Sequence, residues 1–451
     1  MKFIKNNWQY IILIFLFAIL AWFFPLTGKD WFWGCSDNFS NPLNLWLKSD
    51  GNIFFSAIVF TLTNAKIFRV VIYSIVTFGL FYLIKNTINK KNKTVLFISM
   101  FLFLILDLKI WKTVYANITN FSIFFIGTLL LILLINLINC KKFETMSPWL
   151  FFVLGVLGSL IHSLFTLIFF LVSVVLFTKK ILKGKTHNSY LLLFLGSSIG
   201  VVSNLLGVYL NNIEIKFSHI TTNMLNNVVP SLMNYNFIIV LITISFLLFL
   251  SIKTFCKSEM LKKIKVALAM CFLAGYAFII LFSNNVILNY IAFLLYTISS
   301  LYLLINVNNS RLFKSKIILY FTFKLLYISL SSLFVIDNIS FVLFPFIIDI
   351  MIIMELINYV LPQNFLSLVW YIAVCVFAMV NIYVYANVFS KYHDMNKYII
   401  NDIETGNVNI EIPSKYETDY LYDYLPSSSS IEYYLNYYGI YENKDYVFKF
   451  N

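Results

Sequence analysis

The chain has 451 residues, of which 60% are hydrophobic and only 12% are charged, and its mean hydropathy is +0.83. Soluble domains carry about 25% charged residues, so this composition excludes an ordinary soluble protein and indicates one that lies in lipid. The net charge of +13 would suggest nucleic acid as the partner of a soluble chain. No basic block is interleaved with exposed aromatic residues, so we exclude nucleic-acid binding and attribute the charge to lysines in cytoplasmic loops.

The sequence lacks the motifs of several common functional classes. It has no Walker motif, no glycine-rich nucleotide loop, and no CxxC, HExxH or GxSxG pattern, so ATP-driven transport and zinc hydrolysis have no support. The cysteines show no metal-ligand spacing, and only the first is expected on the outer face, which argues against a structural disulfide. They are Cys35, Cys140, Cys256, Cys271 and Cys375.

Long apolar runs predict an all-α polytopic membrane protein. One crossing of a hydrocarbon core about 30 Å thick needs about 20 apolar residues. The first run follows Lys2 and Lys5 as in a signal peptide, but bulky residues occupy the place of a cleavage site, so we expect a retained anchor. In total we expect thirteen transmembrane helices, at residues 8–25, 66–84, 94–110, 121–139, 147–162, 163–178, 189–210, 236–252, 266–282, 286–306, 317–336, 340–361 and 365–387.

The basic residues favour one orientation of these helices. With the N-terminus inside, 20 of the 33 lysines and arginines fall in mostly short inner segments. The positive-inside rule therefore predicts a cytoplasmic N-terminus and an extracytoplasmic C-terminus. The weakest part of the count is the stretch 147–178, which only His162 and Ser163 interrupt. We interpret it as two short spans, because one long span would move the basic loops 179–185 and 253–265 to the outer face.

The chain divides into a transmembrane domain, residues 1–387, and a tyrosine-rich extracytoplasmic tail, residues 388–451. Within the outer loop 26–65, the run IFFSAIVFTL is too short to cross comfortably, so we expect a helix along the outer interface. In the tail, the last span is expected to continue as a helix to Gly406, a C-cap residue. The segment VNIEIP then predicts a strand, and SSSSIEYYLNYYG predicts a short helix.

Asp30 is the first candidate for a chemical role. It follows the first span directly, beside Lys29 and among Trp31, Phe32 and Trp33. A carboxylate at the boundary of water and lipid, with aromatic rings reducing its hydration, is suited to act as a general base. The alternative is an ordinary loop aspartate within an interfacial aromatic belt, and the residue types alone leave both interpretations open.

A second group of candidates lies in the outer turn DLKIWKTVY, between the third and fourth expected spans. Here Asp107, Lys109 and Lys112 would project from the same surface as the first candidate. Two lysines near a carboxylate could hold the phosphate or pyrophosphate of a lipid carrier, with Arg69 and Lys216 as further ligands. Lysines that snorkel from a helix end explain the same pattern.

His162 is the third candidate, at the outer end of the glycine-spaced segment GVLGSLIHS. A histidine there could protonate or orient a group at the outer face, although a histidine bonded between packed helices is as common. On the seventh expected span, Gly196, Gly200 and Asn204 recur every four residues. This spacing predicts a small-residue packing face with one polar contact and no chemistry.

Lys324, Asp349 and Glu355 are ionisable residues well inside the eleventh and twelfth expected spans. Each such charge costs roughly 2.5–3.5 kcal/mol to insert into a bilayer. Lys324 lies between the two acids in depth and could reach either of them. The group is therefore either a buried ion pair that fixes helix packing or part of a hydrophilic pathway or headgroup site.

The arrangement as a whole resembles the GT-C class of membrane glycosyltransferases. The shared features are an acidic residue after the first span, a short interfacial helix, 11–13 spans and an outward C-terminal region. More closely, the chain resembles a poorly characterised family of bacterial polytopic membrane proteins related to that class. The matching segments are PLTGKDWFWG at 25–34, SDGN at 49–52, GVLGSLIHS at 155–163, and IEIP followed by YYGI in the tail.

The resemblance implies a polyprenyl-phosphate sugar donor, used at the outer face with a glycan or lipid-linked acceptor. Asp30 would then activate the acceptor hydroxyl and the outer basic residues would bind the donor phosphate. Many members of the class use a divalent cation, but the outer carboxylates are too few and too scattered to assign a metal site. This chain departs from the family, which carries two adjacent carboxylates where Lys29 and Asp30 stand, and an acidic residue where Ser163 stands.

These observations predict a glycosyltransferase of the cell envelope in the plasma membrane of a bacterium with an AT-rich genome. Two alternatives stay open. Lys324 and its two acidic neighbours would suit a transporter or flippase of a lipid-linked precursor, although we find no internal repeat of the kind that transporters show. The missing second carboxylate would suit a catalytically silent membrane assembly subunit.

Overall fold

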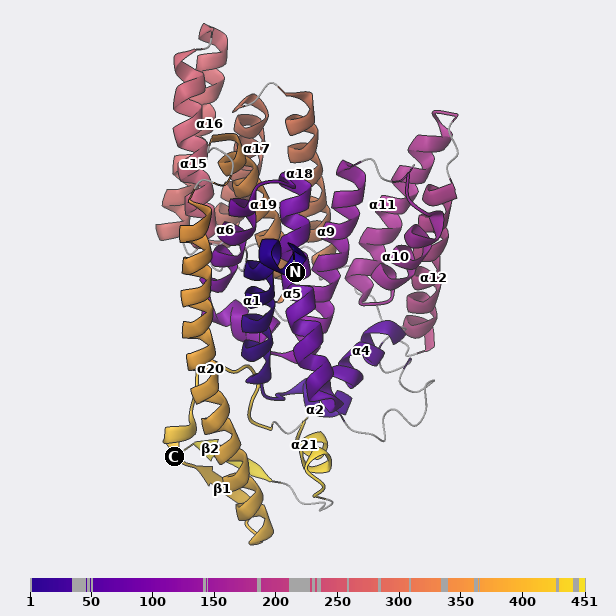
Figure 1. The fold of residues 1–451 in the computed structure, drawn as a ribbon, viewed down its shortest axis with the longest axis vertical. Coiled ribbons are helices and arrows are strands. Elements are labelled where there is room, and N and C mark those ends of the chain that lie inside the picture. Colours follow the sequence, from indigo (N-terminus) through magenta and orange to yellow (C-terminus); the bar gives the residue numbers. More distant parts are fainter. Residues whose placement is uncertain are drawn as a thin grey trace.

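The structure is a computed structural model of the whole chain. It describes residues 2–34, 46, 49, 52–140, 143, 145–184, 188–210, 228, 232, 237–257, 259–282, 285–307, 310–333, 340–360, 364, 366–426, 430–440 and 446–450. Within these residues the fold is all-α apart from one small sheet, as the sequence predicts (Figure 1).

The N-terminal half contains the first long helices and several short segments that follow them. In chain order these are α1 (Lys2–Trp22), α2 (Lys29–Gly34), α4 (Ile53–Asn64), α5 (Lys66–Ile88), α6 (Lys93–Leu104), α7 (Leu108–Ile110), η2 (Trp111–Tyr115), α8 (Ile118–Asn120), η3 (Phe121–Phe125), α9 (Ile126–Asn139), α10 (Pro148–Ser159), α11 (Ser163–Ile181) and α12 (Asn188–Leu210).

The C-terminal half contains further long helices and the tail. Its elements are α15 (Phe237–Cys256), α16 (Met260–Phe282), α17 (Val286–Val307), α18 (Arg311–Ser331), η6 (Ser340–Val342), α19 (Leu343–Val360), α20 (Ser367–Glu404), β1 (Asn409–Ile412), η7 (Ser414–Tyr416), α21 (Ile431–Tyr437) and β2 (Val447–Phe450).

Six helices of the described chain are long and apolar enough to cross a membrane, and a bent pair would make a seventh. The six are Lys66–Ile88, Ile118–Asn139, Ser163–Ile181, Asn188–Leu210, Ser340–Val360 and Ser367–Glu404. The expected span 94–110 is not one straight helix, because α6 ends at Leu104 and the helix that follows is turned by 87°. The break expected within 147–178 is confirmed, since α10 ends at Ser159 and α11 begins at Ser163.

Helix α19 forms the centre of the molecule. Every residue from Leu343 to Leu356 is buried, and the helix packs against α5, α6, α15 and α18 (Figure 1). The sequence LFPFIIDIMIIMEL is apolar on all sides apart from Asp349 and Glu355. Such a helix is buried on every side by its neighbours.

The small-residue face of the seventh expected span packs against α10, as predicted. A Cβ atom on Gly155 would meet the backbone carbonyl of Leu193, and one on Gly196 would meet that of Phe152, so only glycine allows the two helices to lie this close. The amide of Asn204 accepts a hydrogen bond from Ser163 (2.7 Å) and donates one to Thr166 (3.0 Å), which joins α12 to α11.

The tail contains the helix extension, the strand and the short helix that the sequence predicts, and also η7 and β2, which it does not predict. It packs at the same end of the molecule as α2 and α4 (Figure 1). Helix α20 runs without a break past residue 387 and is followed by Gly406 at φ +88°. Strands β1 and β2 pair in parallel, with Asn409 opposite Val447. The hydroxyl of Tyr434 in α21 donates to Asn396 in α20 (2.9 Å), so the short helix is tied to the long one.

Candidate functional site

Asp30 is held at the start of α2 by a reciprocal capping arrangement. Gly28 adopts φ +53°, a left-handed conformation that lets the chain turn between the first helix and α2. The backbone N–H of Asp30 donates to the carbonyl of Thr27 (3.0 Å), and the N–H of Thr27 donates to Asp30 Oδ2 (3.1 Å). The pair satisfies donors that a helix N-terminus leaves open.

The same carboxylate also binds the start of α8. Asp30 Oδ1 accepts from the backbone N–H of Thr119 (2.9 Å) and from its hydroxyl (2.6 Å), and Oδ2 accepts from the N–H of Ile118 (3.4 Å). Asp30 therefore links α2 to a helix start almost ninety residues later in the chain. Helix dipole and hydrogen bonds both favour an anion at that position.

Burial and hydrogen bonding act on the acidity of Asp30 in opposite directions. Its side chain is completely buried, and this desolvation raises the pKa of the carboxyl above its usual value, while the bonds from Thr119, Thr27 and Ile118 lower it in part. Four donors fill the lone-pair positions of a carboxylate. In this conformation Asp30 can accept a further proton donor only if one of the four bonds opens.

Arg69, in the first turns of α5, is the unusual group next to Asp30. The electrostatic neighbours of its guanidinium are Tyr73, Asp30 and Tyr437. The side chain is only 5% exposed, and among the described residues its Nε and Nη1 have no hydrogen-bond partner. The hydroxyl of Tyr73, one turn further along α5, is also buried without one. Buried donors without a hydrogen bond are costly, so these are the groups at this site that a ligand with acceptor oxygens would satisfy.

Helix α21 of the tail covers α2 beside this cluster. Trp31 packs edge-on against Tyr434 (ring centroids 5.0 Å), and Phe32 packs against Tyr433 (4.7 Å). A Cβ on Gly34 would meet the ring of Tyr437. The candidate site is therefore built from α2, α5, α8 and the C-terminal tail together.

His162 is the N-cap residue of α11 and lies near the same loop. Its Nδ1 accepts a hydrogen bond from the N–H of Leu164 (3.2 Å), which requires the neutral imidazole. Burial chiefly, and then the nearby Lys29 ammonium, lower the pKa of His162 to about 4. The histidine is neutral at pH 7, and as it stands it caps a helix and carries no proton to donate from Nδ1.

The second group of candidates has a local role in the structure. Asp107 caps the short helix α7 by accepting from the N–H of Lys109 (2.7 Å), and both residues are exposed. Lys112 is half-buried in η2, and no described hydrogen bond or ion pair joins the three to Asp30. Lys216 lies outside the described residues.

The interior charges form two separate ion pairs between α18 and α19. Lys324 Nζ lies 2.6 and 2.8 Å from the two carboxylate oxygens of Asp349. Glu355 pairs instead with Lys316 (2.8 Å) and accepts from the hydroxyl of Tyr320 (3.1 Å). The sequence alone left either acid open as the partner of Lys324, and the structure pairs it with Asp349.

Several residues of these sites were not identified from the sequence. In the sequence, Lys316 stands just before the expected span 317–336, among the inner basic residues. Lys316, Tyr320 and Lys324 recur every four residues and so share one helix face, and this spacing is a signal that could have identified the pair. Thr119 and Tyr73 carry no such signal, because only the tertiary fold brings them to Asp30.

Comparison with protein-family models, curated proteins and solved structures yields no match for this chain. In the described part of the chain, no three histidine, cysteine, aspartate or glutamate side chains are grouped so that they could share a metal ion.

Proposed function

We propose that this protein is an integral membrane glycosyltransferase that transfers a sugar from a polyprenyl-phosphate carrier at the outer face of a bacterial plasma membrane. In this proposal the chain crosses the membrane about thirteen times in a GT-C-like arrangement. The N-terminus is cytoplasmic and the tail, with the Asp30 site, is extracytoplasmic. This orientation follows from the lysine distribution. The acceptor of the proposed enzyme is a glycan or a lipid-linked molecule.

The observation that carries the proposal is the buried guanidinium of Arg69, which has Asp30 as an electrostatic neighbour and two nitrogens without a hydrogen-bond partner among the described residues. A planar guanidinium with two open N–H positions matches the oxygens of a phosphate group, and the Tyr73 hydroxyl adds a third donor. The guanidinium of such a site can bind a phosphate leaving group, and the carboxylate near it can accept a proton from the attacking hydroxyl.

The proposed reaction is a single displacement at the anomeric carbon. The acceptor hydroxyl transfers its proton to Asp30 and its oxygen forms a bond to the anomeric carbon. The bond from that carbon to the phosphate oxygen breaks, and the carrier leaves as polyprenyl phosphate. Arg69 stabilises the negative charge that develops on this oxygen.

This chemistry requires a local rearrangement, since Asp30 is completely buried. The acceptor hydroxyl would replace the Thr119 hydroxyl as donor to Oδ1, and α21 would have to move away from α2 to admit the substrate. Loss of the ring contacts of Tyr433 and Tyr434 is a modest cost, because an aromatic pair contributes about 0.5–1.5 kcal/mol beyond its buried area.

The direct test is Asp30→Asn in membranes supplied with a polyprenyl-phosphate sugar. The amide cannot accept the proton, so transfer should fall by at least about 100-fold. Asp107→Asn is the matched control, because its carboxylate only caps an exposed turn, and its transfer should stay near the wild-type rate. Transfer by Asp30→Asn at the wild-type rate, with equal amounts of folded protein, would rule out the assigned base.

One observation favours a second candidate, a catalytically silent assembly subunit that binds a lipid phosphate. The four hydrogen bonds to Asp30 are those of a structural clamp. For this candidate Asp30→Asn would lower the melting temperature, and the wild-type chain would bind polyprenyl phosphate without turnover of any sugar donor.

A further inference from the structure

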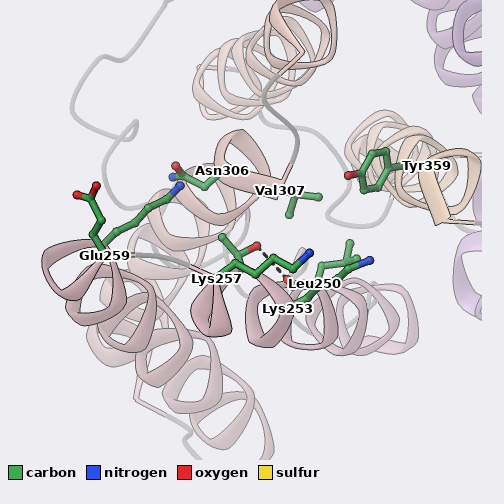
Figure 2. Close-up of a pocket in the computed structure, with 9 residues that line it drawn as sticks. Leu250, Lys253, Lys257, Glu259, Asn306, Val307 and Tyr359 are labelled. Atoms are coloured by element: carbon green, nitrogen blue, oxygen red, sulfur yellow. Dashed lines mark hydrogen bonds between the residues drawn. The ribbon is translucent and has the colours of Figure 1, made fainter.

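A cavity of about 570 Å³ lies at the ends of four helices, apart from the Asp30 site (Figure 2). It is formed by the last turns of α15, the start of α16, the end of α17 and the end of α19. In the orientation proposed above, these ends belong to the cytoplasmic face.

The cavity is strongly basic. Lys253 lies in the last turn of α15, Lys257 directly follows that helix, and Lys262 lies in the first turn of α16. Glu259 is the one acidic residue that lines it, so its side chains carry a net charge of +2. Within the described residues, none of the three lysines pairs with a carboxylate. Figure 2 shows Lys253 and Lys257 beside Leu250 on one side of the pocket, with Asn306, Val307 and Tyr359 opposite them.

The remaining wall offers neutral polar groups and an apolar margin. Asn306 supplies an amide and Tyr359 a phenol, while Leu250 and Val307 give an apolar surface. Beside the cavity, Phe249 and Ile252 of α15 are 63% and 54% exposed, as side chains that face lipid tails are. A basic recess next to a lipid-facing helix fits a molecule with an anionic head and apolar chains.

From this geometry we infer that the cavity binds the phosphate headgroup of an anionic phospholipid of the inner leaflet. Lys253, Lys257 and Lys262 bind the phosphate, Asn306 and Tyr359 offer hydrogen bonds to the rest of the headgroup, and the acyl chains lie along α15. The inference is independent of the Asp30 site and uses only the proposed orientation of the chain.

The test uses the full chain, purified and reconstituted with phosphatidylglycerol at varied fractions in a phosphatidylcholine bilayer. Bound phosphatidylglycerol is counted after limited delipidation by native mass spectrometry. The triple variant Lys253→Gln, Lys257→Gln, Lys262→Gln should bind it on the order of 100-fold more weakly. The matched control replaces Lys179, Lys180 and Lys183 at the end of α11 by glutamine and should bind as the wild type does.

Two further measurements could each contradict the inference. Glu259→Gln should strengthen binding several-fold, because it removes the one negative charge of the cavity and leaves the lysines in place. Excess inorganic phosphate should displace little lipid. Equal losses in both triple variants, no gain in Glu259→Gln, or full displacement by free phosphate would each overturn a specific phospholipid site.

Discussion

Arg69 in α5 and Asp30 at the start of α2 are both buried, but their partners differ. Asp30 has its full set of donors, which come from two elements. Arg69 has two nitrogens without a partner among the described residues. A buried charge that lacks a partner lowers stability, and such a residue is retained where it binds a ligand. Arg69 is therefore the residue whose replacement should weaken ligand binding most.

Replacing Arg69 by Gln should weaken binding of polyprenyl phosphate by about 10- to 150-fold, the value of one charge-assisted hydrogen bond. The melting temperature of the ligand-free protein should change little, because the removal of two buried N–H groups without hydrogen bonds offsets the lost attraction to Asp30. Lys66→Gln, one turn earlier on α5, serves as the control, and both variants can be titrated by tryptophan fluorescence. A variant that binds as tightly as the wild type would exclude Arg69 from the site.

The hydrogen bond from Thr119 to Asp30 gives a prediction on pH dependence. The base works when deprotonated, so transfer falls as pH decreases through the pKa of Asp30, which burial places above the usual value of about 3.9. The Thr119 hydroxyl lowers this pKa in the ligand-free enzyme, so Thr119→Val should move the acid limb of the kcat/KM profile to higher pH. Thr113→Val should leave the profile unchanged, since Thr113 does not contact Asp30.

At the scale of elements, α18 and α19 are joined by charges where most helices of the chain are joined by apolar side chains. The two ion pairs lie on one face of α18, at Lys316 and Lys324, and meet a helix that is buried all round. Two adjacent apolar helices can slide past each other, whereas matched charges at two depths fix their register. The geometry supports the packing interpretation of these charges over a transport pathway.

Lys324→Met should destabilise the protein by about 3–5 kcal/mol, because it leaves Asp349 buried without its partner. The double variant Lys324→Met, Asp349→Leu should recover most of that loss, and Lys314→Met on the same helix should cost little. Steric-trap or thermal unfolding in detergent gives these differences. A Lys324→Met variant of full stability that no longer translocates a lipid-linked precursor would support a transporter instead.

At the scale of the whole molecule, α2, α4 and the tail gather at one end, and the bundle of long helices extends away from them (Figure 1). A site that uses both the N-terminal and C-terminal parts of the chain exists only when the bundle is assembled, because α1 and α20 bring these parts together.

The proposed orientation predicts which residues are reached from outside the cell. In a chain whose five native cysteines are replaced by serine, Ser414→Cys in the tail should react with an impermeant maleimide on intact cells. Lys91→Cys, between α5 and α6, should react only after permeabilisation. Both positions are exposed, so burial does not confuse the result. The opposite pattern would reverse the topology and place the Asp30 site inside.

The sequence by itself was sufficient for the helical class, for the break before α11 and for the strand and helix of the tail. These features depend on local hydropathy and on residues such as Gly406, which act over a few positions. The bend after Leu104 and the pairing of Lys316 with Glu355 were not predicted, because each depends on contacts between distant segments. The same holds for the clamp from Asp30 to Thr119. Only the tertiary structure decides which buried polar groups find partners, and among the described residues it leaves two nitrogens of Arg69 without a hydrogen bond.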